Sequence, residues 1–368
     1  MGRDATADDF DLTKAKTMQE TDKKCPNCGG IMDFDPQSGM LHCPYCDYQE
    51  AIPDSEVKES KAVELDFNTA EFTGNCDWGV EQKTVTCKMC GAVTVYDALE
   101  VANECPYCGS NQVMEANDVK TLAPGGVVAF KITAKQAAER FTTWLKRKWF
   151  CPSEAKKSCK ADAFTGIYLP YWTFDTQTNS TYTAEYGINK KRKRNGQEET
   201  YTEWHSTSGT YDHFVDDELV CGTTNHDRGI LSSIEPYDTE DNKAYRPEYI
   251  AGFAAERYSI GLKDAWEKAK AAIKSELESL IGSKVMNEHN ADTYRNVRLN
   301  TSFNAVTYKY LMLPVWISSF SYKGKVYQFM VNGQSGKVGG RSPVSALRVA
   351  VAVLIVVLIL ALIYFMSS

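Results

Sequence analysis

Eight of the twelve cysteines stand in four pairs of the form Cys-x-x-Cys, a spacing that is typical of metal sites. A Cys-x-x-Cys turn directs two sulfurs at one point, and a second such turn about fifteen residues later completes a tetrahedron of thiolates around Zn²⁺. The pairs are Cys25 and Cys28, Cys43 and Cys46, Cys87 and Cys90, and Cys105 and Cys108. The sequence therefore predicts eight zinc ligands and two structural Zn²⁺ ions.

The four turns form one unit that occurs twice. Fourteen residues separate Cys28 from Cys43, and fourteen separate Cys90 from Cys105, so the unit recurs after 62 residues (87 minus 25). Glycine follows three of the turns, and Asp47, which tolerates a left-handed conformation, follows the fourth. A site with four sulfur ligands leaves no open position for water, so each metal would stabilise the fold and do no chemistry.

Paired cysteines also occur in disulfides and in catalytic thiol exchange. The chain begins with a polar, acidic run and shows no signal peptide, which argues against disulfides. A redox Cys-x-x-Cys normally opens a helix in a thioredoxin-like unit and does not come in matched doubles. Both alternatives are therefore disfavoured.

Charge is divided unevenly along the chain. The formal net charge is −7, but residues 1–124 carry 10 Lys and Arg against 23 Asp and Glu, or −13, which leaves +6 for residues 125–368. Nucleic-acid binding needs a basic surface, because contacts with phosphate supply most of the affinity. The acidic cysteine-rich region would instead attract a basic protein surface.

The C-terminal end is apolar. Residues 349–366 contain no charged side chain, and a helix of this length crosses most of a hydrocarbon core at about 1.5 Å per residue. Lys337, Arg341 and Arg348 precede the segment and no basic residue follows it, so the positive-inside rule places the N-terminal domains in the cytoplasm. We expect a single-pass cell-membrane protein with a C-terminal tail anchor.

These observations predict a multidomain chain with two small zinc ribbons, an α+β body with antiparallel sheets and one transmembrane helix. The body shows a possible internal duplication, because Leu169-Pro-Tyr-Trp172 and Leu313-Pro-Val-Trp316 share the pattern L-P-x-W. The expected segments are an acidic leader (1–23), zinc ribbon 1 (24–52), a connector (53–81), zinc ribbon 2 with a linker (82–124), half A (125–221), half B (222–340) and the anchor (346–366).

Several elements of the body can be predicted from local patterns. Thr133 and Gln136 form a capping box that opens a helix ended by Cys151-Pro152. An apolar face predicts a second helix over 262–281, which we expect Gly282 to end. Residues 248–258 are predicted as a short helix. Strands are predicted as short runs, among them 166–169, 171–175, 181–186, 298–308, 315–322 and 325–331.

Two basic clusters lie in the body. A hairpin tip ending at Asn195-Gly196 could contact an anionic partner or lipid, or it could simply be a soluble turn that discourages edge pairing. Its basic residues are Lys190, Lys191, Arg192, Lys193 and Arg194. The second cluster, Lys146 to Lys148, could touch phosphate or headgroups, or it could be a solvated helix face.

The double ribbon, the L-P-x-W strands, the hairpin 331–338 and the terminal apolar segment together resemble a bacterial family. Its members are tail-anchored and are described as TFIIB-type zinc ribbon-containing membrane proteins. The resemblance covers nearly the whole chain. It implies a membrane-bound cytosolic module without catalysis, and partners of the phage-shock or flotillin-like type in an envelope-stress response.

No catalytic motif is evident. The five histidines form no metal-ligand set, and residues 333–338 lack the length and the hydroxyl of a P-loop. We therefore expect a non-catalytic adaptor, not an enzyme, whose ribbons and body recruit cytosolic or membrane proteins, with no small-molecule substrate. The alternative is a membrane-tethered factor that binds nucleic acid or polymerase, although nucleic acid is disfavoured by the charge.

Overall fold

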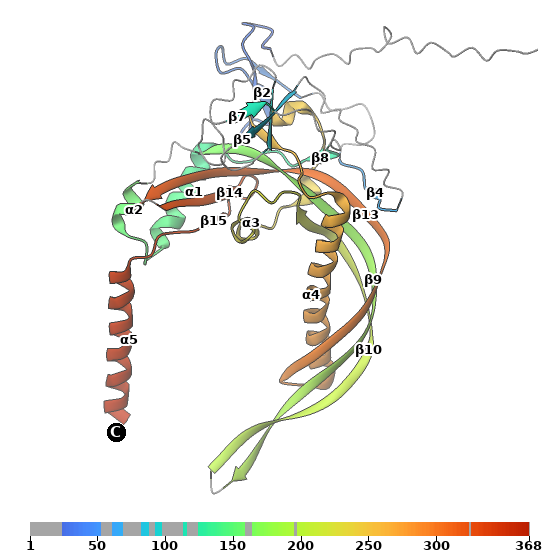
Figure 1. The fold of residues 1–368 in the computed structure, drawn as a ribbon, viewed down its shortest axis with the longest axis vertical. Coiled ribbons are helices and arrows are strands. Elements are labelled where there is room, and N and C mark those ends of the chain that lie inside the picture. The colour runs from blue at the N-terminus through green and yellow to red at the C-terminus, as the bar shows by residue number, and fades with distance from the viewer. Residues whose placement is uncertain are drawn as a thin grey trace, which may run out of the picture.

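The structure is a computed structural model, and Figure 1 shows its arrangement: a curved sheet with one long helix against it, small strands at one end, and an apolar helix that leaves the body at the C-terminus. The predicted α+β body with antiparallel sheets is confirmed. The residues that the structure describes are 24–52, 61–68, 82–87, 93–97, 113–115, 124–158, 164–194, 197–323 and 325–367.

Short strands surround the cysteine-rich region. β1 (Asp33–Asp35), β2 (Met40–His42) and β3 (Gln49–Glu50) form a three-stranded antiparallel sheet in that order. β5 (Gln82–Cys87) pairs with β6 (Val93–Asp97) and with β7 (Val113–Glu115), both antiparallel. The large sheet extends into this second group, because β6 also pairs with β12 (Ala254–Glu256).

Three very long strands form the main part of the large sheet. They are β9 (Thr165–Arg194), β10 (Gln197–Cys221) and β13 (Thr293–Tyr322), and β9 pairs antiparallel with both of the others. The sequence predicts several shorter strands here, and this subdivision is wrong. Runs of Thr, Tyr and Val favour extended backbone, and continuous pairing on both sides of β9 keeps the chain extended through the polar residues between them.

Register shifts bend these strands. β10 shifts between Val215 and Glu218, and β13 shifts twice. A residue with a left-handed backbone lies in each shift: Asp217 (φ 51°), Asn296 (φ 53°) and Ala305 (φ 49°). Such bulges increase local twist and bending. The sheet consequently curves around α4 (Leu262–His289), which contacts β9, β10 and β13 (Figure 1).

The sequence predicts that α4 ends at Gly282, and this prediction is wrong. The helix continues to His289 and ends where Asn290 adopts the left-handed conformation (φ 46°). Gly282 is buried in the helix, and a Cβ at this position would lie 2.2 Å from ring atoms of Tyr294 on β13. The glycine therefore makes room for an aromatic ring against the helix.

Replacing Gly282 by alanine should destabilise the body. Alanine favours a helix interior, but the added methyl group would meet the Tyr294 ring, and such overpacking costs about 1–3 kcal/mol. We expect a lower free energy of unfolding in urea for Gly282→Ala and a neutral or stabilising effect for Ser279→Ala on the exposed face. The explanation would be wrong if Tyr294→Leu did not reduce the cost of Gly282→Ala.

The two L-P-x-W motifs face each other across the sheet, where Leu169 of β9 pairs with Leu313 of β13. The indole N–H of Trp172 donates to the carbonyl of Ile260 at 2.9 Å, and that of Trp316 donates to the carbonyl of Ile132 at 3.0 Å. Ile132 and Ile260 each lie two residues before a helix, α1 (Ala134–Arg147) and α4 respectively. The same type of contact thus recurs at both motifs.

Strands from the two predicted halves are interleaved. β8 (Gly126–Val127), from the first half, runs parallel to β13, and β12, from the second half, runs parallel to β9. The described parts of the two halves therefore share one sheet. The strand β12 also corrects the predicted helix at 248–258, because pairing with β9 and β6 holds residues 254–256 extended, after the 3-10 helix η3 (Pro247–Ile250).

The capping box that opens α1 is confirmed: Thr133 and Gln136 exchange side-chain to backbone hydrogen bonds. The remaining elements are short, apart from α5 at the C-terminus. They are β4 (Leu65–Asp66), α2 (Ser153–Ser158), α3 (Arg228–Ile234), η2 (Thr239–Asp241), β11 (Lys243–Ala244), β14 (Lys325–Asn332), β15 (Val338–Gly340) and α5 (Ala346–Ser367).

Candidate metal centre

Four of the predicted ligands converge in the first cysteine unit. The sulfur atoms of Cys25, Cys28, Cys43 and Cys46 all lie within 4.8 Å of one another. The Cys25 and Cys46 sulfurs are 3.4 Å apart, and those of Cys28 and Cys43 are 3.5 Å apart. Sulfurs about 2.3 Å from a common tetrahedral Zn²⁺ would be separated by nearly this distance. This group could hold a metal ion.

Both turns of the unit use the same backbone hydrogen bonds. The amide of Gly29 donates to the carbonyl of Cys25 at 2.8 Å, and the amide of Asp47 donates to the carbonyl of Cys43 at 3.0 Å. Gly29 and Asp47 are both left-handed, with φ of 74° and 57°. Asp47 therefore occupies the position of the glycine in the other turns, and its side chain lies 3.3 Å from the ring of His42.

The pKa values of two thiols in this group are shifted in opposite directions. The backbone amide of Tyr48 and the side chain of Asn27 lower the pKa of Cys46 to about 6. At Cys28 the hydrogen bond from the Gly30 amide lowers the pKa. The hydrogen bonds with the neighbouring thiols outweigh it and raise the pKa of Cys28 to about 12. A divalent cation would stabilise all four thiolates together.

The first ribbon is docked on the body. Cys25 and Cys43 are buried, and Met32, Phe34 and Leu41 between them belong to the hydrophobic core that also contains residues of α1 and α4. The amide of Phe34 donates to the carbonyl of Ala251 at 3.1 Å, next to η3. The Phe34 ring also meets Tyr249 edge-on, with centroids 5.9 Å apart. Loss of a metal ion from the sulfurs would therefore also disturb the packing between the ribbon and the body.

The second predicted site falls mainly outside the described residues. Cys87 is the last residue of β5, whose backbone alone is described, and Cys90, Cys105 and Cys108 are not described. Within the described part of the chain, one group of four cysteines is brought together. A second Zn²⁺ remains a prediction from the repeated spacing.

The basic hairpin tip lies at the free end of the β9–β10 hairpin, which we call the arm (Figure 1). Three of its five cations face glutamates of the return strand: Lys190 pairs with Glu203, Lys191 lies 3.8 Å from Glu198, and Arg192 lies 2.9 Å from Glu199. Lys193 is exposed. The tip is thus partly neutralised within the hairpin, which reduces its attraction for an anionic partner.

The sequence gives no indication of a buried charge cluster on the curved sheet. Lys309 of β13 lies 2.7 Å from Asp217 and 3.9 Å from Asp175, and Glu64 reaches it at 3.3 Å. Burial raises the pKa of Asp175 to about 6. The carboxylates of Asp175, Asp216 and Asp217 could hold a cation, and the Lys309 ammonium already offsets part of their negative charge.

A second buried polar group surrounds Glu256 on β12. Its carboxylate accepts hydrogen bonds from the hydroxyl of Thr223 and the side-chain amide of Asn225, both at 2.5 Å, and lies 3.0 Å from the ring of His226. These residues come from segments about thirty positions apart, which meet where the amides of Ser259 and Ile260 donate to the carbonyl of Gly222. No sequence motif could have predicted this group.

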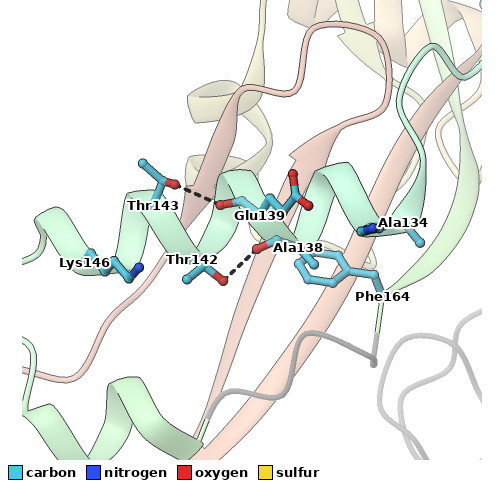
Figure 2. A pocket seen from close by; sticks show the side chains of 8 residues that line it. Ala134, Ala138, Glu139, Thr142, Thr143, Lys146 and Phe164 are labelled. Atoms are coloured by element: carbon cyan, nitrogen blue, oxygen red, sulfur yellow. Dashed lines mark hydrogen bonds between the residues drawn. The ribbon is translucent and has the colours of Figure 1, made fainter.

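An open hollow of about 760 Å³ lies along α1 (Figure 2). The hydroxyls of Thr142 and Thr143 point along the helix and donate to the carbonyls of Ala138 and Glu139, at 2.8 and 3.0 Å. Phe164 closes one side, and Lys146 lies at one end. The threonine hydroxyls are thus satisfied by their own helix.

At the other end of the chain, α5 is long and apolar enough to cross a membrane, over Ala346–Met366 (21 residues). Its first turn contacts the body: Arg348 donates to the carbonyls of Trp149 and Cys151, each at 2.7 Å. The apolar window of the helix is not buried in the body. The helix is therefore available to cross a bilayer as a single span.

The described residues thus define a class: an α+β protein with a four-cysteine site in its N-terminal region and a C-terminal apolar helix. The chain is 30% identical over 340 residues to the Bacillus subtilis (strain 168) protein described as "Uncharacterized protein YdjG". The aligned region covers 89% of this chain and 91% of that protein, so the chain belongs to the family of the B. subtilis protein. No protein-family model and no solved structure matches the chain.

Proposed function

We propose that this protein is a non-catalytic, membrane-anchored adaptor. Structural Zn²⁺ in the Cys25–Cys46 site would hold a rigid, acidic binding head, and the second cysteine unit would hold another Zn²⁺. α5 would anchor the chain in the cell membrane with the N-terminal domains in the cytoplasm. The observation that carries this proposal is the four-cysteine group with all its ligands from protein, docked on a body that also carries the apolar helix.

The docked ribbon supports recruitment of a protein partner. Its sulfurs leave no open coordination position for chemistry, and its fixed place on the body gives a preorganised surface. Tyr45, between Cys43 and Cys46, is 75% exposed at this surface, and exposed tyrosines often act as anchors in protein interfaces. The resemblance implies partners of the phage-shock or flotillin-like type. Nucleic-acid binding has less support, because glutamates pair with three cations of the arm tip.

Photo-crosslinking in membranes tests the proposal. A photo-crosslinking amino acid at position 45 should give a discrete protein adduct, and the same group at Phe214, 57% exposed on the arm, serves as the control. The adduct should disappear when α5 is deleted, because recruitment would then no longer occur at the membrane. A nucleic-acid adduct would favour the alternative, and equal adducts at both positions would contradict the adaptor proposal.

A further inference from the structure

The corner between α1 and α2 combines basic and aromatic side chains beside the start of α5. Lys146, Arg147 and Lys148 end α1 and its cap, all are exposed, and Trp149 and Phe150 follow with exposures of 60% and 40%. We call this surface the α1–α2 corner and include Lys156 of α2, whose ammonium donates to the carbonyl of Lys146 at 3.0 Å. Such exposed aromatic side chains beside cations need an explanation.

Hydrogen bonds fix the corner to the first turn of the apolar helix. One guanidinium nitrogen of Arg348 donates to the carbonyls of Trp149 and Cys151, and the other donates to the hydroxyl of Ser153, each at 2.7 Å. The amide of Ser345 also donates to the carbonyl of Phe150, at 2.9 Å. The corner and the beginning of α5 therefore form one local structure.

This attachment determines the depth of the corner in a bilayer. The uncharged run of α5 begins at Val349, directly after Arg348, so Arg348 must lie at the boundary between hydrocarbon and headgroups. The carbonyls that Arg348 contacts then lie at the same boundary. Trp149 and Phe150 are consequently held at the depth where aromatic rings are favoured, with the cations of the corner at headgroup level.

The direction of the arm constrains how α5 can lie relative to the body in a bilayer. The arm and α5 extend to the same side of the body (Figure 1), so a bilayer around α5 would also meet the arm. The arm carries exposed charges, among them Lys191 and Glu198, which are costly in hydrocarbon. In a bilayer the apolar part of α5 after Arg348 must therefore turn away from the arm, while the contacts of Arg348 with the corner stay in place.

We propose that the α1–α2 corner is a docking surface for anionic lipid headgroups, with Trp149 and Phe150 inserted at the interface. This proposal rests on the membrane anchor of the proposed function, but not on any protein partner. The corner would orient the body relative to the bilayer and keep the docked ribbon facing the cytosol. It differs from the arm tip, whose cations are mostly paired with glutamates.

Full-length protein in nanodiscs tests the docking surface. A photo-crosslinking amino acid at position 149 should form lipid adducts, whereas the same group at Phe214 should not. The yield at position 149 should rise roughly tenfold when phosphatidylglycerol is added to phosphatidylcholine, because each nearby Lys or Arg attracts an anionic surface. Equal yields at positions 149 and 214, or a yield independent of phosphatidylglycerol, would overturn the proposal.

Charge variants provide the matched comparison. Replacing Lys146, Arg147 and Lys148 by serine should abolish most of the dependence on phosphatidylglycerol, whereas the same replacement of Lys190, Lys191 and Arg192 on the arm should leave it unchanged. The opposite result would move the lipid-binding surface to the arm and overturn the proposal. Resistance of the protein to carbonate extraction, measured on the same samples, reports on the α5 anchor separately.

Discussion

Replacing Cys25 by serine should remove one Zn²⁺ per chain. Wild-type protein purified without chelators should contain two Zn²⁺, and Cys25→Ser should contain one, because three thiolates and a hydroxyl bind Zn²⁺ far more weakly than four thiolates. Cys105→Ser should also lose one ion, and the double variant should lose both. Elemental analysis of the purified proteins measures the result. One ion or none in the wild type would contradict the assignment of two sites.

Loss of Zn²⁺ should also destabilise the packing of the ribbon on the body. Binding of structural Zn²⁺ contributes on the order of 10 kcal/mol to the folding of small cysteine sites, and the buried sulfurs share a core with Met32 and Phe34. We therefore expect the 24–52 region of Cys25→Ser to undock from η3 and to be cut rapidly by chymotrypsin at Phe34, which is buried in the intact ribbon, while the body stays resistant.

A second cysteine variant provides the control. Cys151 is as deeply buried as Cys25 but lies at the α1–α2 corner, away from the four-sulfur group. Cys151→Ser should keep the full Zn²⁺ content, and Phe34 should stay resistant to chymotrypsin. Loss of metal in this variant would show that the effect of Cys25→Ser comes from general destabilisation and not from loss of a ligand.

The cysteine site could be predicted from the sequence because its geometry is local. A Cys-x-x-Cys turn fixes two sulfurs through the hydrogen bonds of its own backbone, and these bonds recur at Gly29 and Asp47. The same is true of the capping box at Thr133. Each of these features depends on a few consecutive residues, so tertiary contacts have little opportunity to override them.

Features that depend on strand register could not be predicted. A glycine at position 282, after an apolar helical run, predicts a helix end. Only the position of Tyr294 on β13 shows why a glycine is needed inside the helix. Lys309 meets Asp175 and Asp217 because three strands pair with bulges at particular residues. A shift of one residue would turn these side chains to the other face of the sheet.

The L-P-x-W pattern depends partly on local sequence and partly on strand register. Two four-residue matches are weak evidence for a duplication, yet the motifs pair with each other, and both tryptophans donate to an isoleucine carbonyl two residues before a helix. The division into two related halves stays a prediction. The interleaving of β8 and β12 explains why the halves were predicted as separate segments: the sequence shows the order of elements but not the exchange of strands.

A chain that ends at Ser342 should become soluble. α5 would no longer be present, and its apolar residues each contribute about 0.3–0.6 kcal/mol to membrane insertion. The hydrophobic core clusters of the described residues contain no residue of α5, so the shortened chain should keep its fold and its metal. We expect it in the supernatant after high-salt washing and centrifugation of membranes, whereas the full chain should resist carbonate extraction.

The salt condition separates the two kinds of membrane contact. Without α5, the α1–α2 corner should still hold part of the protein on anionic membranes at low salt, because attraction between its cations and headgroups is weakly screened there. High salt should release this fraction.

As a control that keeps the chain length, Ile355→Arg combined with Ile359→Arg should also impair insertion of α5, since arginine near a helix centre costs about 2.5–3.5 kcal/mol. Retention of the shortened chain on membranes at high salt would show that α5 is not the anchor.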